Sequence, residues 1–425
     1  MNHLQRQIKH KSQSILEWVW CCILFLAGDS VYFKINDAVS MLFEIVLLLV
    51  TIMLILKTAT RFQKKYIKKT LFIAFGNAIV LCIIILNSAD DNIFSNVLQK
   101  TYILCFAVPI FYFLFSILGI DYLLCVLLKR YVTVVTAVAG IGLLLWILLN
   151  LNVMLPTVRI QYSWGQTNSA DGVLGLVFPV QSADQSFLPI HVYRYTLFYV
   201  EGAIAAGYFL ICLMLEICFN NKPRLWVCAI LVCAALCTLS TYGLIATPVI
   251  LLLCLMSSRY FHMLFHKSAL GYACVLTLLG AMVVCIPLWI FFGLQSKQNI
   301  GSLEVHLAGY VGGFRAFMEK PFLGWGIGNY AAMNAFDASA GWTSPLMLGL
   351  TQGGIFYVLL IIAPFCACLV RSASRCRWQY AVFSIVMLSM YVNGCSDNSP
   401  FFASMIALAY FIYEHQDNQI VKANI

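Results

Sequence analysis

The sequence predicts an all-α polytopic membrane protein with about twelve transmembrane helices. Of its 425 residues, 62% are hydrophobic and only 10% are charged, and the mean hydropathy is +0.88. Apolar stretches recur along the whole chain, each long enough to cross or nearly cross the ~30 Å hydrocarbon layer of a bilayer. Clusters of Lys and Arg lie between alternate stretches, as is usual for cytoplasmic loops. This composition excludes a soluble globular protein.

The spans follow from the apolar stretches in chain order. We expect them at about 15–33, 39–57, 70–88, 101–119, 131–153, 195–218, 225–240, 242–257, 268–293, 345–368, 378–394 and 401–413. The run 225–257 is nearly unbroken, and a single long helix there would place the basic residues near 371–377 outside. Two short spans separated by "TLSTYGL" are each ~24 Å long and keep those residues inside, with some bilayer thinning.

The basic clusters determine the expected topology. They are Arg6/Lys9/Lys11, Arg61/Lys64/Lys65/Lys68/Lys69, Lys129/Arg130, Lys222/Arg224, Arg259/Lys267 and Arg371/Arg375/Arg377. Both termini are therefore expected in the cytoplasm. The basic N-terminus has no small-residue cleavage site before Leu16, so it is expected to remain as a tail. The net charge of +9 then reflects topology, and no nucleic-acid partner is expected.

On this topology residues 1–425 form a single membrane domain with two long outward-facing loops, 154–194 and 294–344. Loops of this length are uncommon unless they have a function. The 17 cysteines lie almost entirely in apolar runs, where they act as small apolar side chains. No Cys or His grouping has the spacing of a metal site.

Lys and Arg residues are usually enriched in cytoplasmic loops, so each one in an expected outer loop needs an explanation. Arg159 and Arg194 lie in the first loop, and Arg315 and Lys320 lie in the second, which also contains His306. Arg and Lys side chains suit the phosphate or pyrophosphate of a lipid carrier. Ordinary solvated loop charges or contacts with lipid headgroups are the alternative.

"RYTLFYVEGAIAAGYF" places Arg194 and Glu201 seven residues apart. If a helix begins near Arg194, both residues lie on one face about two turns apart. A glutamate inside a span is costly unless it faces a partner or a polar cavity. The alternative is a glutamate at the helix start, favoured by the helix dipole.

"PFLGWGIGN" has the glycines of a phosphate loop but lacks its Lys-Ser/Thr and a preceding strand, so a nucleotide site is disfavoured. We expect Gly324, Gly326 and Gly328 to allow a tight turn and close backbone approach at the membrane surface. Trp325 suits the membrane interface.

These segments resemble the O-antigen polymerase and ligase superfamily. "RAFMEKPFLGWGIGNY", followed by a span with "LTQGGIFYVLL", is similar to its signature region. Arg194, Glu201 and Gly202 match its R…EPxxxA pattern, and "TLSTYGLIA" is similar to its Ser-Thr-Gly span junction at Ser240, Thr241 and Gly243. Together these segments cover about half of the chain, in the order and spacing of the superfamily.

Two positions depart from the superfamily pattern. Many members have an arginine about fifteen residues before the proline of the glycine motif; His306 stands there, and Arg315 lies nearer the proline. The ligase branch has a His-Asn pair before the glycines of "QGGIF", where this chain has "WTSP", residues 342–345. The resemblance therefore points to the polymerase branch.

The resemblance implies a block-transferring glycosyltransferase in the bacterial cytoplasmic membrane. A growing glycan would move from undecaprenyl pyrophosphate to the next lipid-linked repeat unit at the outer face, without a metal or other cofactor. Arg194 and Arg315 would stabilise the leaving pyrophosphate. Glu201 and His306 would compete for the role of general base, and substrate would be bound by Arg159, Lys320, Gly324, Gly326 and Gly328. Partners would be membrane lipids, a flippase and a chain-length regulator.

Two other functions compete with the polymerase. A ligase would transfer finished glycan to another acceptor, and the missing His-Asn pair argues against it. A polysaccharide transporter or flippase would show repeats and charged groups near the bilayer midplane. Here the unusual charges are expected in outer loops, and no internal repeat can be aligned.

Overall fold

The computed structural model describes residues 15–58, 64–88, 92–164, 167–179, 192–220, 222–258, 301–337, 344–394 and 397–416. Within these ranges the side chains of residues 163, 164, 167, 168 and 301–306 are not described. The expected span 268–293 lies outside the described residues.

The described chain is mostly helical and contains one two-stranded sheet. Its elements are α2 (Ile15–Leu26), α3 (Asp37–Thr58), α4 (Lys64–Asn87), α5 (Phe94–Thr101), α6 (Val108–Leu118), α7 (Ile120–Tyr122), α8 (Leu128–Asn150), β1 (Thr157–Trp164), β2 (Thr167–Val173), α9 (Gly202–Phe219), α10 (Leu225–Cys237), α11 (Thr241–Ser257), α14 (Gly301–Glu319), α15 (Ala331–Phe336), α16 (Pro345–Ser374), α17 (Trp378–Asn393) and α18 (Pro400–His415). The π-helical turns Tyr102–Ala107 and Leu123–Leu127 join α5 to α6 and α7 to α8.

Six helical segments of the described chain are long and apolar enough to cross a membrane. They are Asp37–Thr58, Lys64–Asn87, Phe94–Leu118, Ile120–Asn150, Gly202–Phe219 and Pro345–Ser374. The helices α2, α10 and α11 are apolar but shorter. The chain is therefore a helical protein of membrane type with six helices of full spanning length among the described residues. The twelve expected spans, some of them shorter, stay a prediction.

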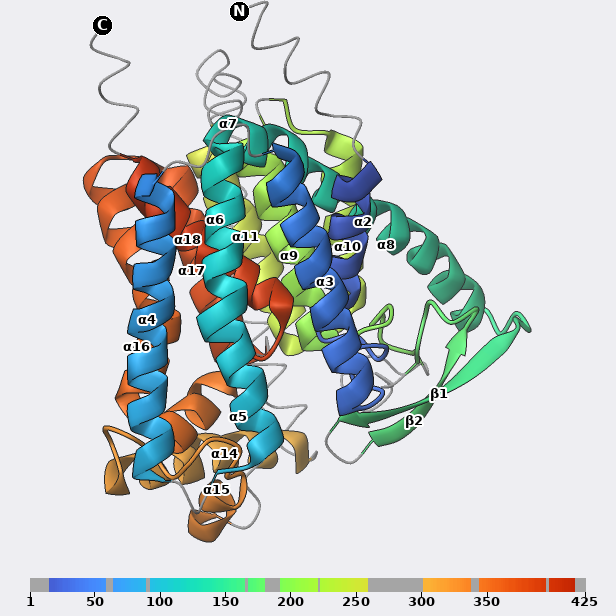
Figure 1. Ribbon diagram of the computed structural model, residues 1–425. Coiled ribbons are helices and arrows are strands. Elements are labelled where there is room, and N and C mark those ends of the chain that lie inside the picture. The colour runs from blue at the N-terminus through green and yellow to red at the C-terminus, as the bar shows by residue number, and fades with distance from the viewer. Residues whose placement is uncertain are drawn as a thin grey trace, which may run out of the picture.

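The helices form a bundle with two distinct ends (Figure 1). At one end α2, α4, α8 and α10 begin and α3, α16 and α18 end, with basic residues in or beside these termini: Lys57, Lys64, Lys129, Arg130, Arg224 and Arg371. We call this the basic end. At the opposite end lie the start of α5, the hairpin β1–β2, and α14 and α15 (Figure 1), and we call it the hairpin end.

Helices α9 and α18 form the centre of the bundle. Nearly every residue of α9 and most residues of α18 are buried, as expected for helices that are apolar all round. Small residues at the start of α9 allow close approach of its neighbours, and Gly207 lies directly against Met390 of α17. Stacked aromatic rings such as Tyr199–Tyr208, with centroids 4.6 Å apart, fill the adjoining space.

The predicted break in 225–257 is observed. Helices α10 and α11 are separate, and Leu239 between them has a positive φ of 47°. The Ser240 side chain accepts a hydrogen bond from the Gly243 amide and so caps α11. Elsewhere the expected bounds are wrong: the first helix stops at Leu26 rather than 33, and the helix expected from 101 begins at Phe94.

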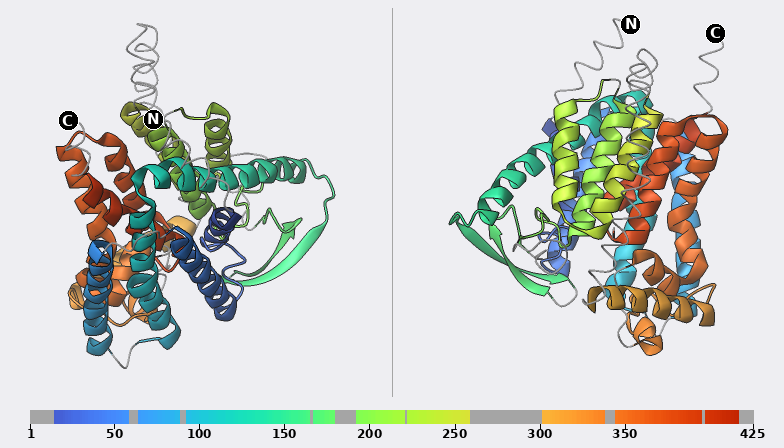
Figure 2. Two further views of the ribbon diagram at one scale, coloured as in Figure 1. Left: turned by 45° about the horizontal axis from the view of Figure 1, so that its top comes forward. Right: turned by 180° about the vertical axis from the view of Figure 1, so that it is seen from behind.

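Both expected loops contain regular structure. The first includes the antiparallel hairpin β1–β2, so the description all-α is incomplete. The second contains α14 and α15, and α14 lies across the helix axes at the hairpin end (Figure 2).

Candidate functional site at the hairpin end

The glycine-rich segment 321–328 is built into a break in α16. In an unbroken helix the amides of Ile355 and Phe356 would donate to the carbonyls four residues earlier. Here they donate instead to the Pro321 and Phe322 carbonyls, at 2.8 and 3.4 Å. The freed carbonyls of α16, from Thr351 and Gln352, accept from the Trp325 and Gly326 amides at 2.8 and 3.0 Å. All four backbone groups are thereby satisfied.

Glycine is required on both sides of this exchange. Gly354 has φ 63° and ψ −164°, and a Cβ there would lie 2.4 Å from the carbonyl carbon of Phe322. Gly324 has φ 69°, and its Cβ would lie 2.4 Å from the carbonyl carbon of Gln352. The expected close backbone approach is confirmed. The Gly324 and Gly326 amides are used within the fold, donating to the Lys320 and Gln352 carbonyls.

The same segment also joins the start of α5. The Ile327 amide donates to Asn92 Oδ1 at 2.7 Å, and the Ile327 carbonyl accepts from the Ile93 amide at 2.9 Å. A Cβ on Gly328 would lie 2.6 Å from the Asn96 side chain. The segment therefore bridges α5 and α16, which are distant in the sequence.

The segment from Arg194 to Glu201 is not helical, so the expected helical face shared by these two residues is wrong. Helix α9 begins at Gly202, with Glu201 as its extended N-cap. Backbone groups of residues 194–201 form hydrogen bonds with distant parts of the chain instead. For example, the Val31 amide donates to the Phe198 carbonyl at 2.8 Å. These tertiary backbone bonds replace the helical ones. Arg194 and Glu201 are both partly exposed.

This second segment packs on the junction between α10 and α11. The Tyr195 amide donates to the Cys237 carbonyl at 3.0 Å, and a Cβ on Gly202 would lie 3.1 Å from the Thr238 carbonyl oxygen. The structure thus brings together "RYTLFYVEG" and "TLSTYG", as it brings together "PFLGWGIG" and "TQGGIF".

Beside these motif pairs lies a group of charged and polar side chains, which we call the ion-pair cluster: Asp29, Lys34, Lys100, Tyr357 and Asp397. All of them except the half-buried Lys34 are buried. Lys100 forms an ion pair with Asp397 Oδ1, and both side chains are less than 10% exposed. Tyr357 donates its hydroxyl to Asp397 Oδ2 at 2.7 Å, and the Lys100 ammonium lies 5.1 Å from the Tyr357 ring centroid.

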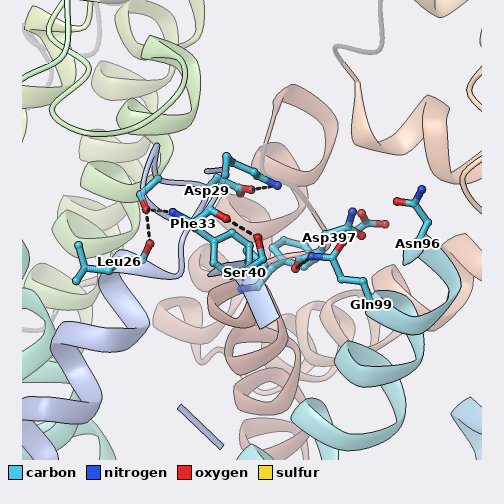
Figure 3. Close-up of polar contacts among 12 residues, drawn as sticks. Leu26, Asp29, Phe33, Ser40, Asn96, Gln99 and Asp397 are labelled. Carbon is cyan, nitrogen blue, oxygen red and sulfur yellow. Dashed lines mark hydrogen bonds and ion pairs between the residues drawn. The ribbon is translucent and has the colours of Figure 1, made fainter. Parts of the chain in front are cut away.

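The cluster also contains the ion pair of Asp29 with Lys34 (Figure 3). Lys34 Nζ lies 3.3 Å from Asp29 Oδ1, and the Asp29 side chain is fully buried. Asp29 also accepts from the Val200 amide through its backbone carbonyl at 3.4 Å, one residue before Glu201. The Asp29–Lys34 pair is thereby linked through the backbone to the segment that ends at Glu201.

Tyr330 follows the glycine-rich segment by two residues and lies within the electrostatic influence of Asp397. Its hydroxyl lies 3.5 Å from Asn96 Oδ1. Burial and the nearby Asp397 carboxylate raise the pKa of Tyr330, so its hydroxyl stays protonated at neutral pH and remains a hydrogen-bond donor.

Burying the charges of Asp29, Lys100 and Asp397 inside a membrane bundle is costly and is typical of functional sites. The backbone beside Lys100 is also irregular, since the π-helical turn Tyr102–Ala107 follows it directly. Pro109 explains the turn, because it provides no amide for the carbonyl of residue 105. Such π-turns are frequent at functional sites.

The cluster was not identified from the sequence. Lys100 falls just before the expected span 101–119, whose helix in fact begins at Phe94, and Asp397 falls between the expected spans 378–394 and 401–413. A lone lysine followed by "TYILCF" was the available signal. Its partner lies 297 residues away, so no local pattern could indicate the pair.

The remaining predicted site residues lie on or beside separate elements at the hairpin end (Figure 1), and none of the cluster's contacts described above involves them. Arg315 is exposed on α14. Lys320 lies 4.2 Å above the Trp325 ring, a cation–π contact. Arg159 is exposed on β1 and hydrogen-bonds Ser169 at 3.3 Å. His306 belongs to α14, but its side chain is outside the described residues.

Ion pairs at the basic end hold helix ends together. Glu216 at the end of α9 accepts from Arg224 Nε and NH2 and from the Arg224 amide, all within 3.0 Å. Glu17 pairs with Arg130. Each pair joins neighbouring helix ends. In the described part of the chain no three His, Cys, Asp or Glu side chains lie close enough together to hold a metal ion.

A scan against protein-family models and searches of curated proteins and solved structures find no significant match to this chain. The functional argument therefore rests on the chain's own residues.

Proposed function

We propose that this protein is a polymerase of lipid-linked oligosaccharide repeat units in the bacterial cytoplasmic membrane. One observation carries the proposal: the four segments that resemble the O-antigen polymerase superfamily are paired in space beside the ion-pair cluster. The hairpin end would face outward and the basic end the cytoplasm, as the positive-inside rule predicts.

The proposed reaction joins an acceptor sugar hydroxyl to the donor anomeric carbon. The new carbon–oxygen bond forms as the bond between that carbon and the pyrophosphate oxygen breaks. The hydroxyl proton passes to a base, for which Glu201 and His306 are the candidates, and undecaprenyl pyrophosphate leaves. Arg194 and Arg315 would stabilise the negative charge of the leaving group as fixed cations.

The ion-pair cluster would act as a positioning device. Lys100 and Asp397 fix α5 against the start of α18, and α5 in turn holds the glycine-rich segment through Asn92 and Ile93. That segment follows Arg315 and Lys320 in the chain. The cluster thus supports the geometry of the cationic side chains without contacting the reacting atoms.

The test is the lipid-linked glycan profile of cells that carry Arg194→Ala or Arg315→Ala, beside wild type and a deletion. Arg371→Ala is the matched control, because Arg371 is a cation at the basic end that lies 4.3 Å from the Tyr413 ring centroid. We expect both site variants to reduce the polymer ladder to a single repeat unit, with the protein retained in the membrane and the control unchanged. A normal ladder in the deletion strain would refute the polymerase.

Two other outcomes identify the alternatives. A ladder that accumulates on the carrier without reaching its final acceptor would indicate a ligase. A transporter or flippase is the second candidate because buried, paired charges such as Lys100 and Asp397 also occur in transport pathways. In that case the deletion would retain lipid-linked repeat units on the cytoplasmic side, inaccessible to externally added glycosidase.

A further inference from the structure

Helix α14 carries an apolar stripe on its exposed face. Leu307, Val311, Phe314 and Met318 are 55%, 44%, 54% and 60% exposed. Their spacing of four, three and four residues places them on a single helical face. Four large apolar side chains in one row are not the usual scatter of single exposed residues on a water-facing surface.

The opposite face of α14 is fixed against the protein by small residues. Gly309, Gly312 and Ala316 are buried, and a Cβ on Gly313 would lie 3.0 Å from Met347 Cβ. The Ala316 carbonyl accepts from Trp325 Nε1 at 2.8 Å. The helix cannot rotate to bury its stripe without breaking these contacts.

An exposed aromatic side chain just after α14 lies against an exposed aromatic side chain of a spanning helix. Phe322, four residues after Met318, is 63% exposed, and its ring centroid lies 6.1 Å from that of Phe356 on α16. Phe356 is itself 44% exposed on a segment long and apolar enough to cross a membrane. The outward side chains of α4 have the same character, with Phe75 65% and Ile79 60% exposed.

We propose that α14 lies in the plane of the membrane surface, with its stripe embedded at the boundary between lipid headgroups and acyl chains. Its orientation across the helix axes at the hairpin end (Figure 2) fits an in-plane helix. Arg315 follows Phe314 at the edge of the stripe, where its guanidinium reaches the phosphate layer, as basic residues do at membrane interfaces. Membrane contact by α14 requires no part of the proposed reaction.

The experiment measures depth in proteoliposomes of phosphatidylethanolamine and phosphatidylglycerol. A fluorescent amino acid replaces Val311 or Phe314 by amber suppression, since the many native cysteines prevent thiol labelling. Glu319, exposed on the same helix but outside the stripe, is the matched control position. Quenching is measured with lipids spin-labelled near the headgroup and with aqueous iodide.

We expect probes at Val311 and Phe314 to be quenched at least threefold more by the lipid than the probe at Glu319, with the reverse order for iodide. Iodide quenching at the stripe positions equal to that at Glu319 would overturn the proposal, because the stripe would face water. Protection from both quenchers in a dimeric particle would also overturn it, because a second copy would cover the stripe.

A second variant distinguishes membrane insertion of the stripe from folding of the protein. Phe314→Glu combined with Met318→Glu changes only exposed positions, so we expect unchanged thermal unfolding in detergent. The Val311 probe should then lose at least half of its lipid quenching. Retained quenching in this variant would contradict insertion driven by the stripe.

Discussion

Replacing Gly354 by alanine tests whether the glycine-rich segment is held by the break in α16. Gly354 has a backbone conformation with φ 63° and ψ −164°, which residues other than glycine rarely adopt. The added methyl group would also lie 2.4 Å from the carbonyl carbon and oxygen of Phe322. Both obstacles involve backbone atoms, so no side-chain rotation relieves them.

The expected loss of stability follows from these contacts. Holding a residue with a side chain in this conformation costs about 1–3 kcal/mol. Relieving the clash separates the two chain segments and loses the hydrogen bonds from Trp325 and Gly326 to α16, each worth about 0.5–1.5 kcal/mol. Together, Gly354→Ala should reduce the free energy of unfolding by about 2–6 kcal/mol.

The assay is thermal unfolding of the purified protein in detergent micelles, followed by tryptophan fluorescence. Gly76→Ala is the matched control, because Gly76 lies in α4 and a Cβ there meets nothing within 4 Å. Alanine at Gly76 should raise helix stability by up to about 1 kcal/mol. Equal melting temperatures for the two variants would refute the proposed coupling between the segment and α16.

Three further predictions use the same melting assay. Lys100→Met or Asp397→Asn alone should lower the free energy of unfolding by about 3–5 kcal/mol, because each leaves a buried charge unpaired. The double variant Lys100→Met with Asp397→Leu should recover most of this loss. A double variant no more stable than the single variants would contradict this prediction. Arg224→Ala should cost about 3–5 kcal/mol by stranding the buried Glu216 carboxylate, yet leave the glycan ladder of the surviving protein unchanged, and a collapsed ladder would assign it a functional role. Ser240→Ala should cost about 1 kcal/mol through loss of the α11 cap, and an unchanged melting temperature would show the cap to be dispensable.

Much of the helical architecture could be predicted from local sequence. The break between α10 and α11 followed from charge placement, since one long helix would have moved the basic residues after α16 to the wrong side. The structural role of Gly324 could also be predicted. Its segment lacks the Lys-Ser/Thr of a phosphate loop, so the simplest role for the glycine is to let two backbone segments approach closely.

The Arg194–Glu201 segment shows where local reasoning failed. Its apolar residues suit a helix, but Phe198 O and Val200 N bond the segment around Asp29 instead. A backbone group makes whichever hydrogen bond the surrounding fold offers, so this outcome depended on a segment almost 170 residues away.

The membrane class and the approximate positions of many helices could be read from the sequence, because apolar length and charge placement act locally along the chain. Which segments meet depends on the tertiary structure. It inserted "PFLGWG" into the break of α16 and paired Lys100 with Asp397 across 297 residues. Backbone exchange and charge pairing depend on the distance between atoms in space, and neither leaves a periodic trace in the sequence.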